Sequence, residues 1–186
     1  MTAEEALIRM NYLQGLGSMV WGRLYKRNLI LNNPFPVGKI YEDSATSYKI
    51  ISDCKKIVTG SKRIYYWVQH EGSTTRQEFD ERQLAGIEAA EQQLEYMQKN
   101  FPNVVQSAKA RYMCKIIEIM KLALQSSNAK IYYKSLKGKM IYYSDVMSDK
   151  NVKRSQKIRL FAVKMGFIPS KIVFWIHEKL KRWKFG

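Results

Sequence analysis

Two adjacent carboxylates, Glu42 and Asp43, are the side chains best suited to chemistry in this 186-residue chain. They open a run with helical spacing, in which Ala45, Tyr48 and Ile51 fall on one face. The pair therefore lies at the predicted start of a helix, where free backbone N–H groups and the helix dipole favour an ionised carboxylate. A carboxylate that is ionised at neutral pH is suited to act as a general base. The plainer alternative is that the two acids only cap the helix.

The residues around this helix predict a small β-sheet. Residues 55–58 read as a strand, 59–62 as a turn, and 63–69 as a second strand that contains three consecutive aromatic residues. Upstream, residues 18–27 read as a strand that runs into a short helix. The acid pair would therefore be positioned by a helix that leads into a β-hairpin.

These elements, in this order, resemble the second half of the catalytic domain of family-2 glycosyltransferases. The resemblance covers roughly residues 4–75. Its motifs are VWGRLYKR at 20–27, FPVG at 35–38, YED at 41–43 and a hairpin that ends in QHEGS at 69–73. Members of this family transfer a sugar, with inversion, from a nucleotide-sugar donor to a glycan or lipid-linked acceptor during synthesis of capsule, exopolysaccharide and other surface polysaccharides. The resemblance implies a glycosyltransferase A-type domain at this end of the chain.

The resemblance also implies roles for individual residues. Asp43 would be the general base that deprotonates the acceptor hydroxyl, and Glu42 would support it. Trp21, Trp67 and His70 would lie in the acceptor cleft or beside the diphosphate. Plainer alternatives stay open, because Trp21 fits a core position equally well and a single histidine at a turn is often a surface residue.

The donor-binding half of these enzymes has no counterpart in the sequence. In the family, a DxD motif holds a divalent Mg or Mn ion that stabilises the leaving diphosphate. No DxD triplet occurs in this chain, so we expect the metal in a full enzyme and none bound by this chain alone. We therefore expect a fragment of a glycosyltransferase that is inactive by itself.

The middle of the chain predicts a helical hairpin. Residues 80–100 and 104–126 carry apolar side chains at spacings of three and four, and a Phe-Pro break separates them. The expected fold class is α+β and mostly helical. It comprises an acceptor-side catalytic part (residues 1–76), a helical hairpin (77–128) and a basic helical tail (129–186).

The positive charge is concentrated in this tail. Residues 130–186 contain 15 Lys and Arg against 3 Asp and Glu, a net +12 of the chain's +16. Such a density suits a phosphate-bearing partner, either anionic lipid or nucleic acid. Nucleic acid is disfavoured because the tail has no RNP-like, helix-turn-helix or glycine-rich motif.

The last predicted helix, residues 170–183, favours a membrane surface. Its apolar stripe consists of Ile172, Val173, Ile176, Leu180 and Trp183, with Trp175 at the border, and its charges include Lys171, Lys179, Lys181 and Arg182. A basic amphipathic helix with tryptophans near the polar boundary lies flat on anionic lipid. The alternative is a terminal helix docked on the protein's own core.

Location and overall function follow from these two ends of the chain. The sequence shows no signal peptide and no apolar run of about 18 residues, and its two cysteines form no metal or redox motif. We expect a cytoplasmic protein, peripheral at the inner face of the plasma membrane. The alternative to a glycosyltransferase is a non-catalytic basic module that binds anionic membrane or RNA.

Overall fold

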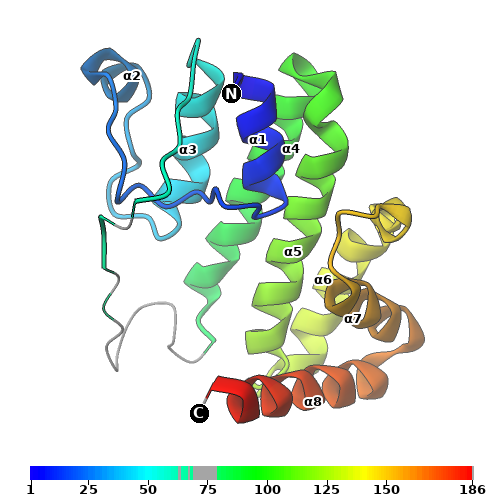
Figure 1. The fold of residues 1–186 in the computed structure, drawn as a ribbon. Coiled ribbons are helices and arrows are strands. Elements are labelled where there is room, and N and C mark those ends of the chain that lie inside the picture. The colour runs from blue at the N-terminus through cyan, green and yellow to red at the C-terminus, as the bar shows by residue number, and fades with distance from the viewer. Residues whose placement is uncertain (63, 67, 69–78, 186) are drawn as a thin grey trace. The chain divides into compact units, whose positions relative to one another are not determined.

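A computed structural model describes residues 1–62, 64–66, 68 and 79–185, with side chains as far as Leu180. These residues form helices and connecting segments and contain no strand (Figure 1). The helices are α1 (Ala3–Asn11), α2 (Arg27–Asn32), α3 (Glu42–Ser52), η2 (Glu81–Leu84), α4 (Ala85–Asn100), η3 (Pro102–Val104), α5 (Val105–Ala123), α6 (Ala129–Tyr142), η4 (Ser144–Ser148), α7 (Arg154–Met165) and α8 (Phe167–Phe185). The chain divides into two compact units, Met1–Tyr112 and Met113–Gly186, and α5 contributes residues to both.

The first unit is built around α3, which packs against both α1 and α4 (Figure 1). Tyr48, Ile50 and Ile51 of α3 are buried in this core. The ring of Tyr48 meets Tyr96 of α4 edge-on, with the ring centroids 5.3 Å apart. The prediction that a helix begins at the acid pair is therefore confirmed, since α3 starts at Glu42.

A buried polar network ties α1 to α4 and to the start of α5. The side-chain amide of Asn11 donates to Ser107 Oγ at 3.0 Å, and its Oδ1 accepts from Gln93 Nε2 at 2.7 Å. Ser107 in turn donates to the backbone carbonyl of Val104 at 2.8 Å. All three side chains are buried, so these hydrogen bonds replace the water that folding removes.

The predicted α+β fold is wrong, because the described residues of the proposed hairpin and of the proposed strand before α2 form no sheet. Val58, Ile64, Tyr65 and Tyr66 are exposed rather than packed on a core. High β-propensity reflects how well a side chain packs on a half-buried sheet, and an isolated two-stranded hairpin is only marginally stable in water. Without a further strand to pair with, the aromatic run lacks the packing that would make it a strand. The expectation of a mostly helical chain fits the structure.

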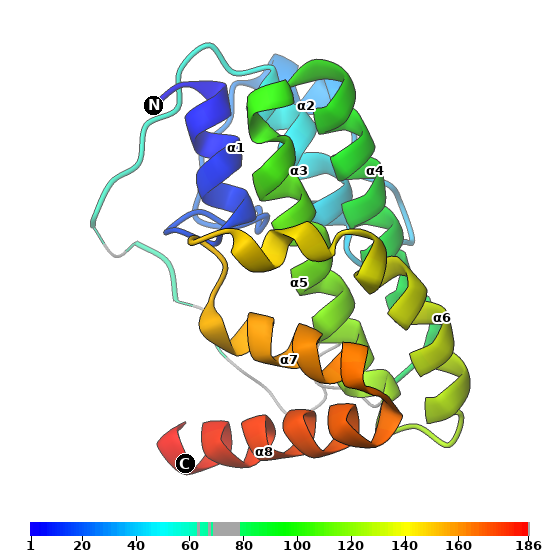
Figure 2. The same cartoon turned by 90° about the vertical axis from the view of Figure 1, so that its right-hand side faces the viewer.

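In the second unit, α7 and α8 pack on each other as a helical hairpin, and α6 contacts α7 (Figure 2). Gly166 makes the turn between α7 and α8, and its φ of 143° is a conformation that favours glycine. Ser170, which is fully buried, donates to the carbonyl of Ala162 at 3.3 Å. The Tyr133 hydroxyl donates to the carbonyl of Val163 at 2.8 Å, which joins α6 to α7.

The last helix starts earlier than the sequence predicts. The predicted start is residue 170, whereas α8 begins at Phe167 and includes Pro169 in its first turn. Proline is tolerated there because the first-turn N–H groups have no partner within the helix. The longer helix brings Ile168 into the same element as the basic tail residues.

Candidate functional site

The acid pair lies at the first turn of α3, as predicted, and Asp43 is held in place from both sides. Its Oδ2 accepts a hydrogen bond from Ser18 Oγ at 3.0 Å, and its Oδ1 accepts from the backbone N–H of Ser44 at 2.6 Å. Glu42 is exposed and Asp43 is half-buried. These contacts suit a carboxylate that fastens the segment at Ser18 to the start of a helix. The role of Asp43 as a general base stays a prediction.

The other residues implied by the resemblance are only partly described. Trp21 is exposed, and its ring stacks on Tyr65 with the centroids 6.2 Å apart. Trp67 and His70 lie outside the described residues. Of the residues that the resemblance implies, the structure therefore places Glu42, Asp43 and Trp21.

Two further features bear on cofactors and on the membrane. Within residues 1–62, 64–66, 68 and 79–185, no three His, Cys, Asp or Glu side chains gather in a way that could hold a metal ion. In the same part of the chain, no helix has both the length and the apolar character needed to span a bilayer.

The clearest surface feature is α8, whose inner and outer faces differ in composition. Ser170 and Phe174 point inward, and Phe174 is only 4% exposed. The opposite face carries large apolar side chains that remain in solvent: Ile168 (69% exposed), Ile172 (52%), Trp175 (63%), Ile176 (43%) and Leu180 (59%). We call these five residues the α8 stripe. Large apolar groups that are exposed together commonly mark an interaction site.

Lysines accompany the α8 stripe. Lys171 and Lys179 are exposed on the same helix. The ammonium group of Lys171 lies 5.7 Å from the Phe167 ring centroid, and that of Lys179 lies 5.7 Å from the Trp175 ring centroid. Lys181, Arg182 and Trp183, which were also predicted to meet the membrane, belong to α8, but their side chains lie outside those described.

The one acid on α6, α7 and α8 is neutralised by an ion pair. The sequences of α6, α7 and α8 contain a single carboxylate, Glu178. Glu178 is only 25% exposed and forms a 3.3 Å ion pair with Lys121 of α5. The outward-facing charges of α8 as far as Leu180 are therefore all positive.

Sequence reasoning found this helix but assigned some side chains wrongly. Val173 was placed in the apolar stripe and is half-buried, whereas Trp175 was placed at the border and is 63% exposed. Phe174 was not recognised as the core contact. The signal that could have found it is its spacing of four from Ser170, a small residue that allows close helix packing.

The α7 helix carries a related feature that the sequence analysis missed. Ile158, Phe161 and Met165 are exposed and spaced by three and four residues, as on one side of a helix. Lys157 directly precedes Ile158, and Lys164 directly precedes Met165. The hairpin of α7 and α8 therefore exposes apolar side chains among lysines on both of its helices.

Comparison with protein-family models, with curated proteins and with solved structures finds no match to this chain. The resemblance to family-2 glycosyltransferases therefore rests on the quoted sequence motifs alone.

Proposed function

We propose that the chain is a membrane-binding module whose α8 stripe lies on an anionic lipid surface. The observation that supports this most directly is the composition of α8. Its inner face is fixed by Ser170 and Phe174, and its outer face combines five exposed apolar side chains with lysines and no unpaired carboxylate. That combination is typical of helices that lie in the interface plane of a membrane.

The magnitudes fit reversible binding. Each side chain of the α8 stripe is roughly half exposed, so its transfer out of water contributes about 1 kcal/mol, and the five together contribute about 5 kcal/mol. Lys171 and Lys179 near an anionic surface add about 1 kcal/mol each. The immobilisation of the protein offsets part of this gain. The net free energy corresponds to a peripheral association that salt weakens.

An anionic leaflet fits this surface better than RNA or a second copy of the chain does. A surface that binds nucleic acid needs cationic side chains along the phosphate backbone, whereas the centre of the outer face of α8 is apolar. A second copy would oppose lysines to lysines, in a region whose net charge is +12 over residues 130–186. The cytoplasmic leaflet, with its negative surface potential, matches both features, so we propose that the protein binds at the inner face of the plasma membrane.

Vesicle flotation of the full chain tests this proposal. Vesicles of phosphatidylcholine with phosphatidylglycerol should retain the protein, and phosphatidylcholine alone should not. Ile172→Ser combined with Ile176→Ser keeps every charge and should lower the partition coefficient about tenfold or more. Leu31→Ser on α2, where the side chain is 63% exposed, is the matched control and should bind like the wild type.

The outcomes separate the alternatives. If the double serine variant binds anionic vesicles as well as the wild type does, adsorption comes from net charge alone and the α8 stripe has no role. Retention on single-stranded RNA without vesicle binding would assign the surface to nucleic acid. Concentration-dependent self-association that the same variant abolishes would assign it to a second copy.

Sugar transfer, the activity implied by the resemblance, stays a prediction. The resemblance implies a β-hairpin after the acid pair, but the described residues of that hairpin form no strand. Asp43 already accepts hydrogen bonds from Ser18 and from the backbone N–H of Ser44 in its own helix. In a full-length enzyme Asp43→Asn should abolish transfer while the fold is kept. Unchanged turnover would remove Asp43 from the mechanism.

A further inference from the structure

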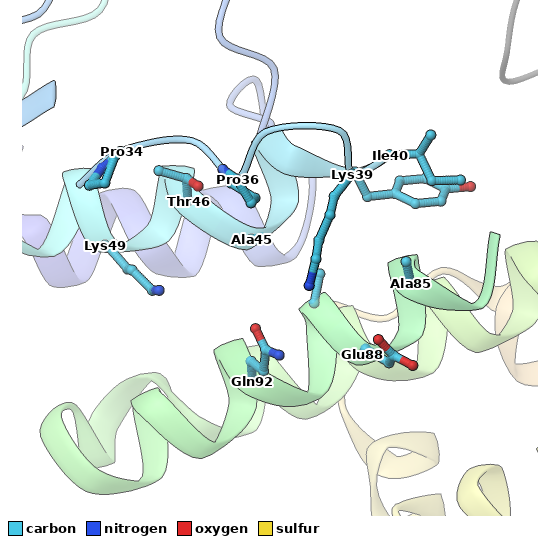
Figure 3. Close-up of a pocket in the computed structure, with 12 residues that line it drawn as sticks. Pro34, Pro36, Lys39, Ile40, Ala45, Thr46, Lys49, Ala85, Glu88 and Gln92 are labelled. Carbon is cyan, nitrogen blue, oxygen red and sulfur yellow. The ribbon is translucent and has the colours of Figure 1, made fainter. Parts of the chain in front are cut away.

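A small pocket in the first unit is lined by none of the α8 stripe residues. It lies between α3, the loop that precedes it, and α4, and its volume is about 190 Å³ (Figure 3). Pro34, Pro36 and Tyr41 form part of its wall. Tyr41 adopts the left-handed conformation with φ 63°, which is uncommon for a residue with a side chain and costs conformational energy. Such residues recur where a fold shapes a functional site.

Four polar side chains line this pocket from opposite sides, and three of them, Lys39, Glu88 and Gln92, are exposed. Lys39 and Lys49 extend from the loop and from α3 toward α4, Gln92 extends from α4 toward α3, and the Glu88 side chain lies along α4 at the wall of the pocket (Figure 3). In the part of the chain that the structure describes, neither lysine forms an ion pair with Glu88, and Gln92 makes no side-chain hydrogen bond. Lys49 only approaches the ring of Tyr48, at 5.7 Å from its centroid. The polar groups are therefore available to a molecule between them.

The arrangement of charge defines the chemistry of that molecule. Two ammonium groups on one side suit a phosphate, for which lysine is a common partner. The single carboxylate of Glu88 on the other side suits an ammonium group, and the Gln92 amide can accept or donate beside it. The pocket side chains sum to one positive charge. A ligand with a phosphate at one end and an ammonium at the other carries about one negative charge at neutral pH and balances them.

We propose that this pocket binds a small phosphate–ammonium zwitterion of the phosphoethanolamine type. Its volume corresponds to about six water-sized groups, which suits such a molecule and is below the usual range for drug-sized ligands. The phosphate contacts Lys39 and Lys49, and the ammonium contacts Glu88. The same chemistry occurs in a free metabolite and in a lipid headgroup.

Titration of the full chain with O-phosphoethanolamine, followed by NMR or calorimetry, tests the site. The wild type should bind O-phosphoethanolamine more tightly than inorganic phosphate or ethanolamine. Lys39→Met and Lys49→Met should each weaken binding about tenfold, as expected for the loss of one charged hydrogen bond. Lys56→Met, an exposed position outside the pocket, is the matched control and should leave binding unchanged.

Glu88→Gln provides the sharper comparison. It removes the group that recognises the ammonium, so it should weaken O-phosphoethanolamine about tenfold while phosphate binds as well as before or better. Equal effects of this variant on both ligands, or equal affinity of the two lysine variants and the control, would overturn the proposal. So would the absence of any binding at millimolar ligand.

Vesicles identify the source of the ligand. If binding to phosphatidylethanolamine in phosphatidylcholine vesicles is lost with Lys39→Met and kept with Ile172→Ser combined with Ile176→Ser, the ligand is a lipid headgroup. If only the soluble compound responds to Lys39→Met, the ligand is a free metabolite. Both results support the site, and neither depends on the α8 stripe.

Discussion

The buried amide of Asn11 should be among the most sensitive polar positions in the first unit. Its side chain is 1% exposed and makes two hydrogen bonds, to Ser107 and from Gln93. Asn11→Ala removes both bonds at once. It also leaves the Gln93 amide, which is 4% exposed, without its acceptor in a place that water does not reach.

The expected cost follows from these contacts. Each lost hydrogen bond contributes about 1 kcal/mol, and a buried donor left without a partner costs about 1–3 kcal/mol. Asn11→Ala should therefore lower the free energy of unfolding by about 3–5 kcal/mol. The triple variant Asn11→Leu, Gln93→Met, Ser107→Ala removes the polar groups together, so no donor is stranded. It should stay within about 1–2 kcal/mol of the wild type, although it carries three substitutions.

The assay must report on the first unit by itself, because two compact units need not unfold together. Amide hydrogen exchange at buried positions of α1 and α4, measured with urea, gives the free energy of opening of that unit. Gln98→Ala, an exposed glutamine of α4, is the matched control and should stay within about 0.5 kcal/mol of the wild type.

The decisive comparison is between the single and the triple variant. If Asn11→Ala lowers the free energy of unfolding no more than the triple variant does, the unpaired donor of the Gln93 amide is not the main cause of the destabilisation. The assignment of this network as a mutually satisfied set would then be wrong.

Two further predictions concern α3. Burial, with added repulsion from Tyr96 and Glu95, raises the pKa of Tyr48 from 10.0 to about 12. The folded unit therefore holds the phenol proton more tightly than the unfolded chain, so this contribution is complete below pH 10 and is lost as the pH rises to about 12. The loss amounts to about 3 kcal/mol, and urea midpoints from pH 8 to 12 should fall more steeply for the wild type than for Tyr48→Phe. Asp43→Asn should lower the free energy of unfolding by about 0.5–1 kcal/mol, because Asp43 fastens Ser18 to the start of α3. A cycle with Ser18→Ala that shows no coupling between the two residues would contradict that role.

Some helix positions could be predicted because their signals are local. The start of α3 at Glu42 needs only an acid near a helix end and an apolar stripe behind it. The basic amphipathic character of the last helix also follows from its own residues, since apolar side chains recur every three or four residues and lysines lie between them. Both features survive in the structure, with changes of a few residues at the helix ends.

The hairpin was mispredicted because a strand is not a local structure. Tyr65, Tyr66 and Val58 have high β-propensity, but that propensity needs a partner strand and a core on one face. The sequence of this segment does not reveal whether a partner strand or a core beside it exists. In the structure these side chains are exposed, and the described residues around them connect helices.

The sequence by itself determined the helical periodicity, the placement of charge in the tail and the acid pair at a helix start, because these depend on neighbours within a turn or two. Only the tertiary structure decided which side of α8 faces inward, since that depends on how Phe174 and Ser170 pack against α7 and the rest of the second unit. It also brought Lys39 to the same pocket as Glu88, 49 positions along the chain. Contacts between such distant residues arise from helix packing, which no local pattern records.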